Sequence, residues 1–200
     1  MTESVEIEVL GLSSKAMRYN KKAGSPKSHA QEIIQALTLQ SGMVVFDVGA
    51  GGGYFTALFS NSVGPHGLVY ALDTDPEMLD YISEQIQSRN ISNVKVVLVS
   101  SNRFRHVPTG IADLIFMRNM AHHLDDRLDY FKGLKPFLKP TGRVAIIDYT
   151  KGGWFSWKRW FGHYVERYQL EDEMRRAGFY IVEQMYFLPE QSFTIFALKH

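Results

Sequence analysis

Residues 44–56 read VVFDVGAGGGYFT, and this stretch decides the fold. An apolar run containing Asp47 leads into five small residues, 49–53, of which four are glycine. Glycine accepts positive φ and lets a ligand approach the main chain without meeting a Cβ atom. Because these glycines stand between a predicted strand and a predicted helix, they predict a nucleotide-type crevice at the end of the strand.

Further apolar runs rich in valine and isoleucine predict more strands, at 68–73, 94–99, 112–117 and 142–148. Strands buried on both faces of a parallel sheet have this composition. Helical patterns alternate with them, at 76–90, 126–138 and 166–177. Thr74 or Asp75 can cap the first of these helices, and Gly178 stops the last. The alternation predicts right-handed crossovers and a doubly wound sheet.

The last two strand patterns, 179–187 and 192–198, are separated only by a short turn. Such neighbours cannot be joined by a crossover helix, so they predict an antiparallel hairpin. The expected fold class is therefore α/β, a Rossmann-like doubly wound sheet of seven strands, mostly parallel, with the hairpin at its C-terminal end. We expect residues 1–200 to form a single domain, the size at which a chain builds one substantial core.

Composition narrows the function. The chain has 200 residues, a formal charge of +1 and no cysteine. The near-neutral charge gives no case for a nucleic-acid partner, and the missing cysteines exclude thiol chemistry and iron–sulfur clusters. The N-terminus, MTESVEIEVL, carries acids where a secretory signal carries positive charge. We therefore expect a cytoplasmic protein that acts on small molecules.

The glycine stretch does not fit two common phosphate-binding patterns. A dinucleotide fingerprint would need a glycine at position 54, where the chain has Tyr54, and no Lys-Ser/Thr pair follows to make a phosphate loop. An oxidoreductase that uses NAD is disfavoured for this reason and because of the terminal hairpin.

Several motifs together resemble the class I S-adenosylmethionine-dependent methyltransferases, especially the small single-domain type that includes quinone-biosynthesis enzymes. The resemblance runs from about His29 to Leu198. It rests on DVGAGGGYFT, ALDTDPEML, DLIFMRNMAHHL, LKPFLKPTGRVAIID, EDEMRRAGF and the closing hairpin with FLPEQ. In this order the set is far more specific than the glycine stretch alone.

The resemblance implies S-adenosylmethionine as the cofactor and assigns residues to its parts. Asp47 and the small residues after it would hold the methionine moiety, with Asp47 acting on its ammonium directly or through water. Asp73 would accept both ribose hydroxyls, a role for which a carboxylate has two oxygens; the alternative is a strand-end cap. Thr74 and Met78 would lie along the adenine. The small residues of this set are Gly49, Ala50, Gly51 and Gly53.

One departure concerns the third strand. The family usually has an acid after it that binds the adenine amino group, whereas this chain has Ser100 and Ser101. A hydroxyl still accepts that bond, at a cost of about 1 kcal/mol relative to a charge-assisted bond. A non-catalytic protein that binds the cofactor, or a partner subunit, is the alternative that this departure keeps open.

Residues 118–123 follow the fourth strand, where the family's reactive methyl group emerges. A phenol, enol or amine acceptor must lose a proton, and His122 or His123 is the candidate base because imidazole titrates near neutrality. The alternative for either is capping or packing. Arg118 and Asn119 are candidate contacts of cofactor or acceptor. Adjacent histidines have poor metal spacing, so we expect no metal.

Residues 151–168 form an aromatic insertion, the least family-like stretch, and residues 1–27 an N-terminal lid segment whose Tyr19 would face the acceptor. If the insertion is helical, Trp157, Phe161 and Tyr164 share one face. Three readings stay open for it. They are packing over the sheet, a lid in which Trp154, Trp157 and Phe161 line an apolar acceptor pocket, and a peripheral membrane contact. We expect the N-terminal segment to begin with a flexible, basic stretch and then to form a helix from about Ser28.

Overall fold

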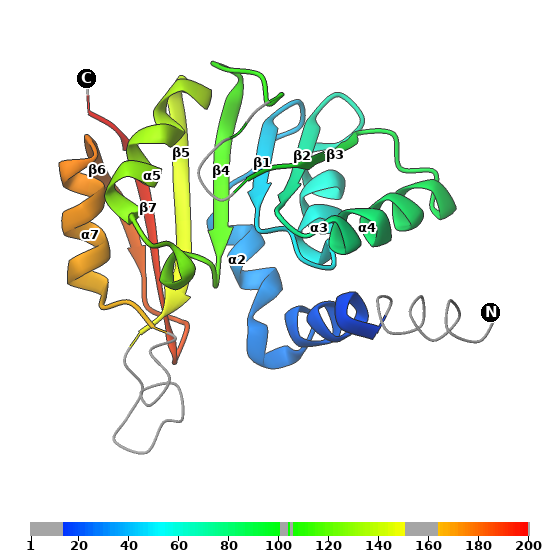
Figure 1. The fold of residues 1–200 in the computed structure, drawn as a ribbon, viewed down its shortest axis with the longest axis horizontal. Coiled ribbons are helices and arrows are strands. Elements are labelled where there is room, and N and C mark those ends of the chain that lie inside the picture. Colours follow the sequence, from blue (N-terminus) through cyan, green and yellow to red (C-terminus); the bar gives the residue numbers. More distant parts are fainter. Residues whose placement is uncertain (1–13, 101–103, 105, 151–163, 200) are drawn as a thin grey trace. The chain divides into compact units, whose positions relative to one another are not determined.

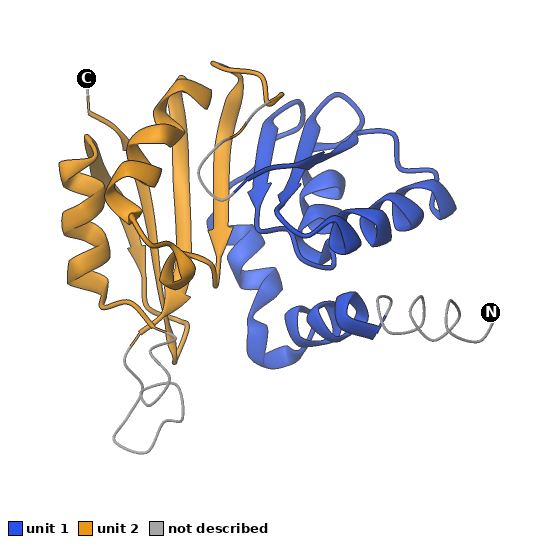
Figure 2. Ribbon diagram, viewed as in Figure 1, with its two compact units in different colours: residues 1–100 blue, residues 101–200 orange. Residues whose placement is uncertain are grey.

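The computed structural model describes residues 14–100, 104, 106–150 and 164–199. The chain forms two compact units, Met1–Ser100 and Ser101–His200 (Figure 2). Each unit contains both strands and helices (Figure 1).

The first unit holds a parallel sheet of order β3-β2-β1. Its strands are β1 (Val44–Val48), β2 (Leu68–Asp73) and β3 (Val94–Leu98). Its helices are η1 (Pro26–Ser28), α2 (Ala30–Ala36), α3 (Tyr54–Val63) and α4 (Pro76–Ser88), and residues 14–23 are also helical. α3 packs on β1 and β2 and α4 on β2 and β3, so each crossover helix covers the strands that it joins. Leu79 and Ile82 of α4 cluster with Ala71 of β2.

The second unit holds a mixed sheet of order β4-β5-β7-β6. Its strands are β4 (Ala112–Arg118), β5 (Leu138–Tyr149), β6 (Phe179–Met185) and β7 (Gln191–Leu198). β4 and β5 are parallel, whereas β7 pairs antiparallel with both β5 and β6. The helices are η2 (Ala121–His123), α5 (Arg127–Leu134), η3 (Lys135–Phe137) and α7 (Arg167–Arg176). α5 and α7 pack together, joined by a two-pronged ion pair in which Arg127 Nε and a terminal nitrogen donate to Glu173 at 2.6 and 2.9 Å.

The predicted fold class is confirmed: the described residues form seven strands, mostly parallel, and end in an antiparallel hairpin. The predicted caps also hold. Asp75 caps α4 by accepting a hydrogen bond from the Glu77 N–H at 3.0 Å, and Gly178 follows α7 with φ at +92°.

Three local expectations were wrong. β3 is not buried on both faces, because it is an edge strand with Leu98 56% exposed. The segment expected to begin with a flexible stretch is helical over residues 14–23, whereas the helix expected from about Ser28 is present and begins at Ala30. Tyr164 is not helical; beside it the Val165 N–H donates to the Tyr149 carbonyl at 3.0 Å. Trp154, Trp157 and Phe161 lie outside the described residues.

No helix in the described ranges is both long and apolar enough to cross a lipid bilayer.

The C-terminal end of α3 is closed by a buried side chain. Asn93 donates to the carbonyls of Ser60 and Gly64 at 3.0 and 2.9 Å and accepts from the Ser60 hydroxyl at 2.6 Å. The first two bonds go to main-chain carbonyls at the end of α3, where intrahelical donors run out, and the third gives the buried Ser60 hydroxyl an acceptor.

Asn93→Ala is expected to lower the free energy of unfolding by about 2–3 kcal/mol, because it removes the acceptor of the buried Ser60 hydroxyl and two hydrogen bonds to carbonyls at the helix end. Chemical denaturation monitored by circular dichroism measures the change. Asn61→Ala, at an exposed position of the same helix, is the control and should change stability by less than about 0.5 kcal/mol. Equal effects of the two substitutions would contradict this account of the helix end.

Candidate functional site

The turn after β1 is built around glycines in the left-handed region. Gly49, Gly51 and Gly53 have φ of +74°, +53° and +79°. The N–H groups of Gly49 and Ala50 donate to the carbonyl of Leu72 in β2 at 2.8 and 3.1 Å. The turn is therefore fastened to the carboxyl end of the neighbouring strand, the end at which open α/β sheets bind ligands.

The glycines of this turn serve different purposes. A Cβ added to Gly51 would meet nothing within 4 Å in this structure. A Cβ on Gly52 would collide with Ala16 and Asn20 of the helix at 14–23, and one on Gly53 would lie 2.8 Å from Ile82 of α4. Packing thus accounts for Gly52 and Gly53, while Gly51 borders open space that a ligand can use.

Asp73 connects the end of β2 to that turn. Its Oδ2 accepts from the Gly51 N–H at 2.8 Å, and its Oδ1 accepts from the Asp75 N–H at 3.0 Å. The capping alternative is therefore part of its role. Each carboxylate oxygen has a second lone pair, so the same group retains the capacity to accept two hydroxyls in an orientation that the backbone has fixed.

Asp47 lies beneath the turn, with 3% of its surface exposed. Burial raises the pKa of this carboxyl to about 7; the hydrogen bond from Thr56 opposes the rise, and the charge of Asp73 adds to it. The Thr56 hydroxyl donates to Asp47 Oδ2 at 2.6 Å. Asp47 is thus a carboxyl poised to ionise near neutral pH, which suits a partner of positive charge.

The remaining cofactor residues predicted in this unit differ in accessibility. Thr74 and Ser100 are exposed, whereas Met78 is only 2% exposed and packs inward from the first turn of α4. Of the two residues predicted along the adenine, Thr74 is therefore the one that is open to a ligand in this conformation. Ser101 lies outside the described residues.

The helix at 14–23 rests on the glycine turn. Besides its contact with Gly52, it is tied to the N-cap of α4 by Lys15, whose Nζ donates to Asp75 Oδ2 at 2.6 Å. This bond raises the pKa of Lys15 and lowers that of Asp75. Tyr19 of this helix is 44% exposed. Residues 14–23 of the predicted lid segment therefore lie against the turn at Gly52.

In the second unit, a polar network lies at the carboxyl end of β4. Gln191 bridges Arg118 and Asn119: its carbonyl oxygen accepts from the Arg118 guanidinium at 3.2 Å, and its amide nitrogen donates to Asn119 Oδ1. Burial lowers the pKa of Arg118 to about 10. Asn119 has φ at +56°, and its N–H donates to Ile147 of β5 at 2.8 Å. The network holds a guanidinium and two amides in place where parallel strands end.

The carboxyl end of β5 supplies Asp148, whose side chain is fully buried. Its Oδ1 lies 2.6 Å from His122 Nδ1, and its Oδ2 accepts from the His122 N–H at 3.0 Å. The His123 ring is adjacent, with ring centroids 4.0 Å apart, but residue 123 is exposed. The structure therefore separates the two predicted bases: one is buried and paired with a carboxylate, the other faces solvent.

Sequence reasoning missed Thr56, Asp148 and Gln191 as members of these groups. Asp148 ends the apolar run of its strand as Asp73 does, which was a usable signal. Gln191 had none, because only the antiparallel pairing of Gln191 with Tyr149 brings it to this edge. Within the described ranges, no three His, Asp or Glu side chains gather in a way that would hold a metal ion.

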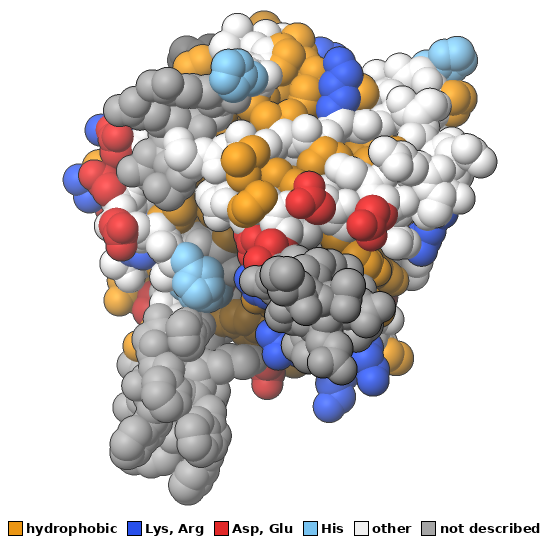
Figure 3. Space-filling model, turned by 45° about the vertical axis from the view of Figure 1, so that its right-hand side comes forward, with side chains coloured by type: hydrophobic (Ala, Val, Ile, Leu, Met, Phe, Trp, Pro, Cys, Tyr) orange, Lys and Arg blue, Asp and Glu red, His pale blue; other side chains and the backbone are white. Residues whose placement is uncertain are grey.

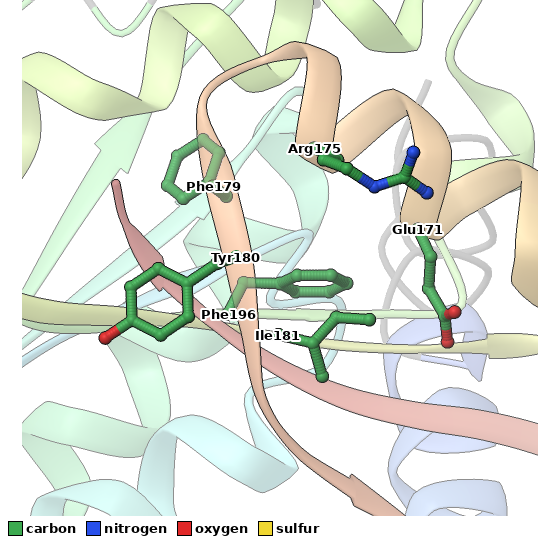
Figure 4. A pocket seen from close by; sticks show the side chains of 6 residues that line it. All are labelled: Glu171, Arg175, Phe179, Tyr180, Ile181 and Phe196. Carbon is green, nitrogen blue, oxygen red and sulfur yellow. The ribbon is translucent and has the colours of Figure 1, made fainter. Parts of the chain in front are cut away.

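A surface pocket between α7 and β6 does not belong to these groups (Figure 4). It is lined by Glu171, Arg175, Phe179, Tyr180, Ile181 and Phe196. Phe196 pairs with Val144 of β5, whereas Gln191 pairs with Tyr149 at the end of that strand. The pocket therefore lies toward the amino end of β5, away from the end that pairs with Gln191.

Known proteins are similar to this chain in sequence and in fold. A family described as a methyltransferase domain matches residues 39–183. A SAM dependent methyltransferase from Aquifex aeolicus superimposes with a TM-score of 0.78 at 26% identity, over 92% of this chain and 98% of the other. The chain belongs to the methyltransferase domain family, and its class is that of the S-adenosylmethionine-dependent methyltransferases.

Curated relatives carry different substrate names. Demethylmenaquinone methyltransferase from Listeria welshimeri is 26% identical over 67% of this chain and 56% of its own length. Phosphoethanolamine N-methyltransferase 1 from Zea mays is 29% identical over 60% of this chain and 23% of its own. The chain thus spans about half the length of the first relative and about a quarter of the length of the second. The two relatives are named for different acceptors.

The raised pKa of Asp47 predicts how stability depends on pH without cofactor. The folded protein keeps this proton up to pH about 7, whereas the unfolded chain releases it near the usual 3.8. The contribution of the protonated Asp47 to the free energy of unfolding is complete below pH 3.8. It is lost as the pH rises to about 7, and the loss is at most about 4 kcal/mol.

Asp47→Asn retains an acceptor for Thr56 and should flatten this part of the curve of unfolding free energy against pH. Denaturation at pH 4 to 8 measures it. Asp80→Asn, on the exposed face of α4, should reproduce the wild-type curve. Parallel curves for Asp47→Asn and wild type would show that the carboxyl ionises normally in the fold.

Proposed function

We propose that this protein transfers the methyl group of S-adenosylmethionine to a small, apolar acceptor by in-line displacement. The observation that carries the proposal is the turn after β1, in which Gly51 borders open space and Asp73 is fixed by the Gly51 N–H. Together they offer a bare backbone for one part of a cofactor and an oriented carboxylate for a diol.

The cofactor residues that we propose follow from this geometry. Asp73 binds the ribose hydroxyls with its remaining lone pairs, and Asp47 attracts the ammonium of the methionine moiety. The turn from Gly49 to Gly53 carries the backbone contacts, with Thr74 and Ser100 toward the adenine. A sulfonium methyl is already activated, so alignment of the nucleophile with the methyl–sulfur bond supplies most of the rate enhancement.

For the acceptor, we propose a small molecule with an apolar body. The aromatic insertion at 151–168 supports an apolar pocket, because such pockets are lined largely by aromatic side chains. An acceptor from a lipid phase would also suit a peripheral membrane contact of the insertion. Charge gives no support for a nucleic-acid acceptor, since lysine and arginine stand among acidic and hydrophobic side chains on the face shown in Figure 3.

Turnover tests the proposal directly. The protein is incubated with methyl-labelled S-adenosylmethionine and a panel of quinols and apolar phenols, and S-adenosylhomocysteine is quantified with and without each acceptor. Acceptor-dependent release of S-adenosylhomocysteine supports the proposal. Cofactor binding without turnover of any acceptor, including amines and carboxylates, would instead assign a non-catalytic role.

Gly51→Val is expected to abolish S-adenosylmethionine binding while the protein stays folded, because the new side chain would fill the space beside the turn. Both this change and Gly42→Val place a valine at positive φ with no atom within 4 Å of the new Cβ. Gly42→Val is therefore a matched control for backbone strain and should bind the cofactor as wild type does. Calorimetric titration of both variants measures the difference; equal affinities would show that the cofactor lies elsewhere.

A further inference from the structure

Exposed apolar side chains gather in one part of the second unit. In the described part of the chain, six of the nine large hydrophobic side chains that are exposed lie within residues 168–187. They belong to α7, to β6 and to the two residues after β6, and they form what we call the α7–β6 surface: Tyr168, Tyr180, Ile181, Val182, Tyr186 and Phe187. A gathering of exposed apolar side chains marks an interaction surface.

The strand of this surface lies at an edge of the sheet. Among the described strands, β6 pairs with β7 alone, and its residues 180–183 are all exposed. The pairing register shifts between Ile181 and Glu183, so Val182 is the extra residue of a bulge. A bulge hinders the addition of another strand to an edge. The surface therefore offers side chains to a partner rather than a place for a further strand.

The helix of this surface carries charges of both signs beside an exposed ring. Tyr168, Asp172 and Arg175 share one face of α7, because they are spaced i, i+4 and i+7. Tyr168 is 73% exposed, and the side chains of Asp172 and Arg175 are 46% and 69% exposed. Arg175 Nη1 donates to Asp172 Oδ1 at 3.0 Å, which uses only part of a guanidinium that has five donors. Arg175 also lines the pocket beside β6 (Figure 4).

This face of α7 is complementary to its own reverse. If a second copy places its α7 antiparallel to the first, a two-fold axis halfway between positions 172 and 175 sets Asp172 of each copy opposite Arg175 of the other. The same axis brings Tyr168 of each copy to the level of Phe179 in the other, where the pocket between α7 and β6 begins. The charges thus favour a second copy of this chain as the partner.

We propose that the protein forms a two-fold symmetric homodimer through the α7–β6 surface. Asp172 and Arg175 pair across the axis twice, and Tyr168 seats against the pocket of the second copy as the apolar anchor. Tyrosine and arginine are the kinds of residue that contribute most to binding at interfaces. An isologous contact closes on itself, so the assembly stops at two copies. This inference does not depend on the proposed activity.

Charge exchange across the axis tests the proposal by sedimentation velocity of the full chain between about 1 and about 100 µM. Wild type should dimerise within this range. Asp172→Arg and Arg175→Asp should each be monomeric, because each sets like charges opposite one another. An equimolar mixture of these two variants should recover the dimer, because every charge then meets its opposite. Tyr168→Ala should weaken the dimer by at least about 10-fold.

Arg176→Asp is the matched control, because it reverses the charge of an exposed arginine of α7 that lies off the proposed face. This variant should dimerise as wild type does, and circular dichroism should show all variants folded. Wild type that stays monomeric at the highest concentration, or that forms assemblies larger than a dimer, would overturn the proposal. Dimers of both single charge variants, or failure of their mixture to dimerise, would overturn it as well.

Discussion

The hydrogen bond from the Gly51 N–H to the Asp73 carboxylate is the constraint on which the proposed cofactor site depends. It requires three things at once: a strand that ends at Asp73, a turn that points its N–H groups toward that strand, and a residue at position 51 that adopts positive φ. The carbonyl of Leu72, which accepts from Gly49 and Ala50, provides the second fastening. The parallel pairing of β1 with β2 makes both fastenings reachable, because it places the two carboxyl ends side by side.

A comparable logic governs the second unit. Parallel pairing of β4 with β5 brings residues 118–119 near the end of β5, and the antiparallel return of β7 adds Gln191 from the far side of the chain. Each polar group there is held by another: Gln191 holds Arg118 and Asn119, and Asp148 holds His122. Such pairing keeps these polar groups oriented and lowers the cost of removing them from water.

Much of the fold could be predicted from the sequence because its signals are local. Apolar runs, the cap at Asp75 and the stop at Gly178 depend on neighbours within a few residues, and all were found. The exposure of β3 could not be predicted, because edge strands and inner strands can have the same composition and differ only in which elements lie beside them. The helix at 14–23 was missed because its basic surface was interpreted as a flexible face, whereas its contact with Gly52 is a tertiary property.

For the site, the sequence identified the residue types and their order, but it did not show which residue makes which contact. The glycines look alike in sequence, yet only coordinates show that Gly52 and Gly53 face protein while Gly51 faces open space. His122 and His123 are likewise equivalent until the fold buries one ring against Asp148. Partnerships of this kind join residues 26 positions apart in the chain, which no local pattern encodes.

The most direct test of the central claim, that the turn after β1 is built for the cofactor, is calorimetric titration of the wild-type protein with S-adenosylmethionine, S-adenosylhomocysteine and NAD. The account predicts binding of the first two with a Kd in the micromolar range and one site per chain, and no heat with NAD. Absence of binding to both sulfur compounds at millimolar concentration, in a folded protein, would contradict it.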